Sequence, residues 1–305
     1  MDSMSATPLR PTLVCMSWRG GARLRRCLES ISRSRDHFDR CIVSITGSRN
    51  GEDMRTAAEF QGTIRDLEVI CTDRELPTMK HQEFWVDYLE NSGSAPSDWI
   101  FWLAHDDEVR PRGIKEVIDG SGNWPLQADT AYFGPWAMRH ESASDLWHGD
   151  QDAILESWTS LPQRGPNRLR IETWIRQQLL QPTYMQMSGS VNPLRSFIRL
   201  RDSRPRKKGP MRIEMAIAAD PYTQFVEEFA SPVSIVYGRP NSDRSSYGAS
   251  ARAEDFHLGV TLARYSLRNP MAFSGLVTAA VRLLGDRVAG KAPREEWRIR
   301  GHVQP

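Results

Sequence analysis

The sequence predicts an α/β fold in which a mostly parallel sheet is flanked by helices, and two observations lead to it. Short apolar runs at residues 12–16, 41–45, 67–71 and 99–103 are expected to form strands, and a fifth strand begins at 131–134. Segments with helical periodicity separate these runs. Strands that alternate with helices imply βαβ units, and unbroken apolar runs are typical of strands buried on both faces.

The first helical segment shows the periodicity clearly, because Leu24, Cys27, Leu28 and Ile31 recur on one face and arginines occupy the other. Further helices are expected at residues 79–89 and 111–118, the latter with Pro111 in its first turn. The second half is less regular, with helices expected at 172–180 and 211–219, a loop or strand at 184–191, a late strand at 233–237, and helices continuing to about 288.

The composition is that of an ordinary soluble protein, with 305 residues, 39% hydrophobic and 26% charged. The formal net charge of +2 gives no argument for a nucleic-acid partner. The four cysteines form no CxxC pair and lie in apolar segments, so we interpret them as reduced core residues. Neither the N-terminus nor the apolar stretch 271–281 predicts a signal peptide or a membrane span. We expect a cytoplasmic chain, at most peripheral at the inner membrane face.

Polar residues and glycines follow three of the predicted strands. In parallel sheets, ligands bind beyond the carboxyl ends of the strands. The residues at these ends are Ser17, Trp18 and Arg19 after the first strand, Thr46 and Gly47 after the second, and Asp106 and Asp107 after the fourth. We therefore expect a ligand site at this edge of the sheet.

The pair Asp106–Asp107 directly follows a buried strand and precedes a helix. Carboxylate oxygens in this position suit a hard divalent cation, Mn²⁺ or Mg²⁺, which would also contact phosphate oxygens of a ligand. Such an ion neutralises a leaving diphosphate. The alternative is a solvated acidic turn whose charge favours the N-terminus of the following helix.

Three segments together resemble the nucleotide-binding half of the family-2-type inverting glycosyltransferases, which have the GT-A fold. These segments are the helix at 24–31, the turn at 45–48 and the acidic element Ala104-His105-Asp106-Asp107. The resemblance implies a nucleotide-diphospho-sugar donor and a metal site in which Asp106 binds the ion, with Asp107 beside it and close to the sugar or ribose. Two departures stand out: the family carries acidic residues where this chain has Ile45 and Thr46, and Ala104 replaces the first acid of the DxD motif.

The same resemblance implies a general base in the acceptor half. The segment 209–214 is similar to the family's Gly-x-Arg-x-Glu element, which makes Glu214 the expected base and Arg212 a neighbouring phosphate-side or orienting group. Asp220 and Glu172 are the alternatives. An ordinary carboxylate in the first turn of a helix would also explain Glu214.

Other features of the second half leave a functional and a structural interpretation open. Arg239 and Ser246 belong to a loop that resembles the family's diphosphate-closing segment or is a plain surface loop. Trp136 and Trp147 would stack on an acceptor sugar or fill the core. The basic stretch 194–212 is a solvated loop, a lid over the donor or a contact to a lipid-linked acceptor. The apolar stripe at 273–288 packs on the domain or lies on a membrane surface.

The resemblance therefore predicts a metal-dependent inverting glycosyltransferase that acts on a saccharide or lipid-linked acceptor in cell-surface polysaccharide or glycolipid synthesis. We expect a GT-A domain at 1–250, with a nucleotide-binding half at about 11–140 and an acceptor half at about 141–250, followed by a C-terminal helical extension at 251–305. The alternatives are a non-catalytic sugar-nucleotide-binding partner of another transferase and a metal-dependent phosphohydrolase. GxGxxG spacing and a Walker motif are absent from the sequence.

Overall fold

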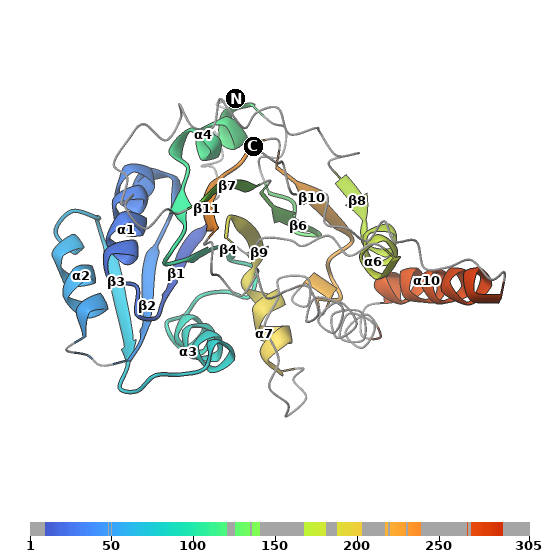
Figure 1. The fold of residues 1–305 in the computed structure, drawn as a ribbon, viewed down its shortest axis with the longest axis horizontal. Coiled ribbons are helices and arrows are strands. Elements are labelled where there is room, and N and C mark those ends of the chain that lie inside the picture. The colour runs from blue at the N-terminus through green and yellow to red at the C-terminus, as the bar shows by residue number, and fades with distance from the viewer. Residues whose placement is uncertain are drawn as a thin grey trace, which may run out of the picture.

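The computed structural model describes residues 10–47, 49, 51–120, 126–134, 136–140, 168–180, 188–202, 217–218, 220–229, 231–238, 267 and 270–288. Their main feature is an eight-stranded sheet (Figure 1). Its strand order is β3 (Leu67–Thr72), β2 (Cys41–Thr46), β1 (Thr12–Ser17), β4 (Trp99–Ala104), β9 (Ser190–Pro193), β6 (Thr130–Phe133), β10 (Phe225–Glu228) and β8 (Arg168–Arg170). A smaller sheet has the order β5 (Glu108–Val109), β11 (Ser234–Gly238) and β7 (Trp136–His140).

The pairing is mostly parallel, as the sequence predicts. Strands β3, β2, β1 and β4 are mutually parallel, and β10 is parallel to β6. Strand β9 runs antiparallel to both β4 and β6, and β8 runs antiparallel to β10. All five strands predicted from the first half are present, and the late strand at 233–237 corresponds to β11. Strands β5, β7, β8 and β10 are short, and the sequence analysis did not predict them.

Helices cover both faces of the sheet, because successive side chains of its strands point to opposite sides. Leu13 and Cys15 of β1 belong to one core cluster, which includes residues of α1 (Ala22–Ser34), α2 (Glu52–Phe60) and α4 (Pro111–Gly120). Val14 and Met16 belong to the other, which includes residues of α3 (Thr78–Asn91), α6 (Ile171–Leu180) and α7 (Leu194–Asp202). The sequence analysis missed α2 and α7.

Helix α7 corrects one expectation. The basic stretch 194–212 was expected to be a loop or a lid, but residues 194–202 form a packed helix with Leu194, Phe197 and Leu200 in the core. Two of its three arginines are held in ion pairs: Arg195 with Asp220, and Arg201 with carboxylates of α3. Amphipathic spacing, rather than the charge count, decides the structure of this part.

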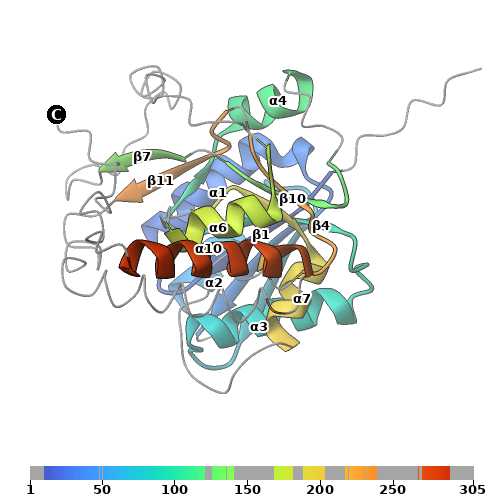
Figure 2. The same ribbon diagram turned by 90° about the vertical axis from the view of Figure 1, so that its right-hand side faces the viewer.

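Helix α10 (Pro270–Val288) lies alongside α6 on the outside of the domain (Figure 2). The two backbones approach closely at Gly275, where a Cβ atom would lie 2.2 Å from the carbonyl oxygen of Glu172. The predicted helix up to about residue 288 is thus confirmed, and it packs on the domain. None of the described helices is both long enough and apolar enough to cross a membrane.

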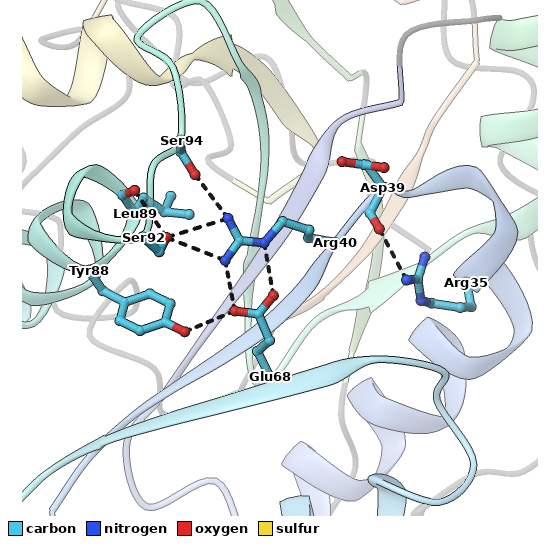
Figure 3. Close-up of polar contacts among 8 residues, drawn as sticks. All are labelled: Arg35, Asp39, Arg40, Glu68, Tyr88, Leu89, Ser92 and Ser94. Atoms are coloured by element: carbon cyan, nitrogen blue, oxygen red, sulfur yellow. Dashed lines mark hydrogen bonds and ion pairs between the residues drawn. The ribbon is translucent and has the colours of Figure 1, made fainter.

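At the amino-terminal edge of the parallel strands, Arg40 and Glu68 form a bidentate ion pair (Figure 3). Tyr88 donates a further hydrogen bond to the same carboxylate, at 2.9 Å. These hydrogen bonds, that of Arg40 above all, lower the pKa of Glu68. The network joins β2, β3 and the end of α3 at the edge opposite to the strand ends where a ligand is expected.

Candidate functional site

The carboxyl ends of β1, β2 and β4 meet at one edge of the sheet. The chain runs from β1 to β2 and β3 on one side and returns to β4 on the other, so β1 and β4 flank a topological switch point. Ligands of doubly wound sheets bind at such points. The backbone N–H of His105 donates to the carbonyl of Met16 at 3.0 Å and ties the two strand ends together.

The turn after β1 is held by a carboxylate from a different helix. Asp53, in the first turn of α2, accepts hydrogen bonds from the Ser17 hydroxyl at 2.7 Å and from the backbone N–H groups of Gly20 and Gly21, both at 2.9 Å. Its side chain is only 6% exposed. From its position after β1, Ser17 is expected to contact the nucleotide-sugar donor. In the structure its hydroxyl donates a hydrogen bond to Asp53 instead.

This arrangement places a negative charge at the N-terminus of α1. In dinucleotide-binding folds the amides at this position bind a pyrophosphate. Here the amides of Gly20 and Gly21 already bind the carboxylate of Asp53. A diphosphate bound at this edge would therefore need other groups to compensate its charge.

Trp18, Arg19 and Glu75 form the rim of the site, and we refer to these three residues as the rim. The Trp18 side chain is 50% exposed, and the Arg19 guanidinium lies 5.2 Å from its ring centroid. Arg19 also donates two hydrogen bonds to Glu75, at 3.0 and 3.1 Å. Its backbone has φ 50°, a conformation that is strained for a residue with a side chain. An exposed aromatic face and a charged pair thus stand at the open end of β1.

The turn after β2 lies beside the rim. A Cβ atom on Gly47 would be 3.9 Å from Cγ of Glu75, and Gly47 has φ 137°. The Thr46 hydroxyl oxygen accepts a hydrogen bond from the backbone N–H of Leu76 at 2.6 Å, and the hydroxyl donates to the carbonyl of Arg74 at 3.3 Å. Thr46 is buried, and its two hydrogen bonds hold the segment 74–76, which carries Glu75.

The two aspartates of the acidic element have different surroundings. Asp107 is 3% exposed, and its carboxylate accepts hydrogen bonds from the Ser188 hydroxyl and, at 3.2 Å, from the backbone N–H of Tyr237. Asp106 is half-buried at the end of β4. The sequence suggests that the two aspartates act together at one site. In the structure, Asp107 instead links the end of β4 to β11 and to the turn at Ser188.

Glu108 completes the acidic element from inside the protein. Its carboxylate lies 3.1 Å from Nε of Arg26, and the Tyr237 hydroxyl donates to it. Arg26 also lies over the Tyr237 ring, with its guanidinium carbon 3.7 Å from the centroid, and donates to the carbonyl of Asp106 at 3.1 Å. The position of the acidic turn is thus set by a buried ion pair that the sequence analysis did not identify.

A divalent ion fits the donor chemistry of this edge. Among the described residues, no group of three or more His, Cys, Asp or Glu side chains gathers around a common point. Mg²⁺ is nevertheless commonly held by one or two carboxylates together with the phosphate oxygens of a ligand. Asp106, half-buried at the strand end, offers such a carboxylate.

His81 of α3 is buried and forms a hydrogen bond with a serine of the sheet. Its Nε2 lies 2.9 Å from the Ser44 hydroxyl oxygen of β2. Burial lowers the pKa of His81 to about 4, and the nearby His105 contributes to the same shift. His81 is therefore neutral at physiological pH.

The residues predicted for catalysis, for the diphosphate side and for the acceptor side in the second half of the chain are only partly described. Trp147, Arg212, Glu214, Arg239 and Ser246 lie outside the described residues, and Trp136 opens strand β7.

Both alternative bases have structural partners. Asp220 is fully buried and accepts hydrogen bonds from Arg195, Ser196 and Thr223 at 2.9 to 3.1 Å. Glu172 pairs with Arg170 at 2.7 Å. The backbone N–H of Tyr222 donates a further hydrogen bond to the Asp220 carboxylate, at 3.1 Å.

Comparisons with known proteins support the fold. No protein-family model matches the chain, and no curated protein matches it. Among solved structures, Staphylococcus aureus TarS 1–349 in complex with UDP-GlcNAc is similar, with a TM-score of 0.56 at 10% identity over 96% of this chain and 76% of that one. TarS 1–349 in complex with UDP gives a TM-score of 0.54 at 10% identity over 92% and 72%. These similarities confirm the predicted GT-A-type fold.

Proposed function

We propose that this chain is a glycosyltransferase that takes a sugar from a nucleotide-diphospho-sugar and binds the donor at the carboxyl ends of β1, β2 and β4. The observation that carries the proposal is the convergence of the rim, the Thr46–Gly47 turn and Asp106 at the β1–β4 switch point of a GT-A-type sheet. Trp18 and Arg19 follow β1, the Thr46–Gly47 turn follows β2, and Asp106 follows β4. Together they offer an aromatic face, a cation and a carboxylate suited to a divalent ion.

The choice of donor class rests on two supports. TarS, whose fold is similar, was crystallised with UDP-GlcNAc and with UDP. In this chain, the backbone N–H groups before α1 already donate hydrogen bonds to Asp53. This disfavours binding of a pyrophosphate there, where dinucleotide-binding folds hold it. In the proposed arrangement, the nucleobase of the donor lies beside Trp18, and its diphosphate points towards Asp106.

A divalent ion, Mn²⁺ or Mg²⁺, is part of the proposal, with Asp106 as its protein ligand and Asp107 beside it. When bound, the ion would neutralise charge on the leaving diphosphate. The protein's own contribution is to hold the acidic turn in place through the Arg26–Glu108 ion pair and the Ser188–Asp107 hydrogen bond.

Inversion at the sugar requires a base for the acceptor hydroxyl. We propose Glu214 for this role, with Arg212, Arg239 and Ser246 on the diphosphate side and Trp136 and Trp147 on the acceptor side. A saccharide or lipid-linked acceptor follows from the family resemblance alone.

We also propose a cytoplasmic location with peripheral contact to the inner membrane face. Four free cysteines support a reducing compartment. Helix α10 exposes an apolar stripe that suits a lipid surface, formed by Phe273, Val277, Val281 and Leu284. Co-sedimentation with anionic vesicles tests the contact, and the double variant Val281→Ser/Leu284→Ser should reduce it.

A non-catalytic sugar-nucleotide-binding partner of another transferase is the second candidate. One observation favours it: Ala104, at the end of β4, stands where the family's first acid is found, and its side chain packs against the core. Binding of the nucleotide without release of nucleoside diphosphate from the donor would identify this function.

The test is calorimetric titration with UDP, GDP, CDP and dTDP, with and without Mn²⁺. We expect tight, Mn²⁺-dependent binding of one nucleotide that is lost in Asp106→Ala. The control is Asp36→Ala, which removes an exposed carboxylate far from the strand ends. Absence of binding to every nucleotide under both conditions would overturn the proposal. Steady-state release of nucleoside diphosphate from the matching donor then separates catalysis from binding.

A further inference from the structure

The β1–α1 turn, residues 18–21, carries two rim residues, and its backbone is hydrogen bonded to a side chain from outside the turn. Arg19 has φ 50° and Gly21 has φ 50°, so two of its four residues adopt a backbone conformation that side chains disfavour. The hydrogen bonds that stabilise this conformation reach Asp53, which lies more than thirty residues further along the chain.

We propose that Asp53 is a positioning residue for the nucleotide: its carboxylate takes the place of a bound anion at the start of α1 and holds Trp18 and Arg19 where they meet the ligand. The proposal rests on the proposed function, because it assigns Asp53 a role in donor binding. Asp53 itself is buried beneath the turn and does not touch the ligand in this arrangement.

The charge of Asp53 suits this position. It lies in the first turn of α2 and accepts hydrogen bonds from the backbone N–H groups that precede α1, so a negative charge there interacts favourably with the positive ends of two helix dipoles. Its two carboxylate oxygens accept three hydrogen bonds, one from a hydroxyl and two from the backbone. An asparagine of the same size has one acceptor oxygen, and its NH₂ group would face an N–H donor.

Packing transmits the position of the turn to the rest of the site. A Cβ atom on Gly20 would lie 2.8 Å from the Ser17 hydroxyl oxygen and 2.9 Å from Cδ2 of His105. The turn is therefore in direct contact with the residue that precedes Asp106. A shift of the turn by a fraction of an ångström would disturb both the rim and the start of the acidic turn.

The decisive experiment combines a measurement without ligand and one with ligand. Amide hydrogen exchange over residues 17–22 of the free protein reports whether Asp53 holds the turn. Calorimetry with the nucleotide that the wild type binds, and KM and kcat for its donor sugar, report whether this matters for function. The variants are Asp53→Asn, Ser17→Ala, which removes one of the three hydrogen bonds and keeps the carboxylate, and Glu68→Gln as the control. The control breaks an ion pair with Arg40 at the opposite edge of the sheet.

In Asp53→Asn we expect amide exchange in the turn to accelerate, and nucleotide affinity to fall by roughly tenfold or more, as is usual when a hydrogen bond to a charged group is lost. The donor KM should rise more than kcat falls, because the defect lies in binding. Ser17→Ala should show a smaller change in the same direction. Glu68→Gln should lower the melting temperature without altering exchange in the turn or affinity.

Three results would overturn the proposal. The turn could exchange at the wild-type rate in Asp53→Asn, which would show that the carboxylate does not hold it. The turn could loosen while affinity stays unchanged, which would show that its position does not matter for the nucleotide. Affinity could fall equally in Glu68→Gln, which would show a general loss of stability. Failure of the wild type to bind any nucleotide is a different result, since it overturns the proposed function itself.

Discussion

The guanidinium of Arg26 lies 3.1 Å from the carboxylate of Glu108, and the two side chains are only 6% and 2% exposed. The pair connects α1 to the short strand that follows the acidic turn, and Tyr237 closes it from β11 through its ring and its hydroxyl. Arg33 also reaches the Glu108 carboxylate, at 3.8 Å, from an exposed position. Removing Arg26 is nevertheless costly, because the buried Glu108 carboxylate then loses its nearest cation while still excluded from water.

We predict that Arg26→Met lowers the free energy of unfolding by about 3–5 kcal/mol, the usual loss when one partner of a buried ion pair is removed. The double variant Arg26→Met/Glu108→Gln should recover part of this loss, because the buried carboxylate charge is then gone. Urea unfolding measures both. The control is Arg25→Met, at the neighbouring position of α1, whose exposed pair with Glu59 contributes less than about 1 kcal/mol. Equal losses in Arg25→Met and Arg26→Met would contradict the assignment.

Asp106 and Asp107 should respond differently to the same substitution. Asp107→Asn replaces a buried carboxylate that accepts hydrogen bonds from Ser188 and Tyr237, so we expect a loss of about 1–3 kcal/mol in unfolding free energy. Asp106→Asn should change stability by less than about 1 kcal/mol, as for most substitutions outside the core. It should nevertheless abolish the Mn²⁺-dependent part of nucleotide binding. Thermal unfolding and calorimetry on both variants check this, and retained Mn²⁺ dependence in Asp106→Asn would exclude Asp106 as the ligand.

Glu75 should matter for the ligand and hardly at all for stability. Its pair with Arg19 is exposed, so Glu75→Gln should change the unfolding free energy by less than about 1 kcal/mol. Arg19 would lose its bidentate anchor, and we expect nucleotide affinity to fall together with the preference between UDP and GDP. The matched control is Glu59→Gln, which disrupts another exposed pair. Identical nucleotide binding by Glu75→Gln and wild type would remove Glu75 from the site.

Stability should decrease in mild acid because of His81. Its pKa is lowered to about 4 in the folded protein, so the unfolded chain takes up the proton first as the pH falls. The contribution is fully present above pH 6.5 and is lost progressively between pH 6.5 and pH 4, to a total of about 3 kcal/mol at 1.36 kcal/mol per pKa unit. Urea unfolding at several pH values should show a weaker decline for His81→Gln than for wild type. Parallel declines for the two proteins would mean that other groups cause the acid sensitivity.

Much of the fold could be predicted because it depends on local periodicity. The strands around Val14 and Phe101 are unbroken apolar runs, the strand around Val43 is interrupted only by Ser44, and the face of α1 repeats every three to four residues. Helix α7 is hard to predict because three arginines alternate with its apolar residues. Leu194, Phe197 and Leu200 nevertheless share one face of the helix. Short strands such as β8, at the edge of the sheet, and β10, between β6 and β8, have too few residues for a period-two pattern to stand out.

The residues that reach the strand ends can be identified from the amino-acid pattern alone, because a buried strand followed by polar residues places those residues at the edge of a parallel sheet. Trp18, Gly47 and Asp106 were found in this way. Three assignments are visible only in the folded protein: Asp53 holds the β1–α1 turn, Glu75 joins the rim, and Asp107 turns inward while Asp106 remains at the edge. These assignments depend on hydrogen bonds between residues far apart in the chain, which form only when packing brings their elements together, so no local pattern records them.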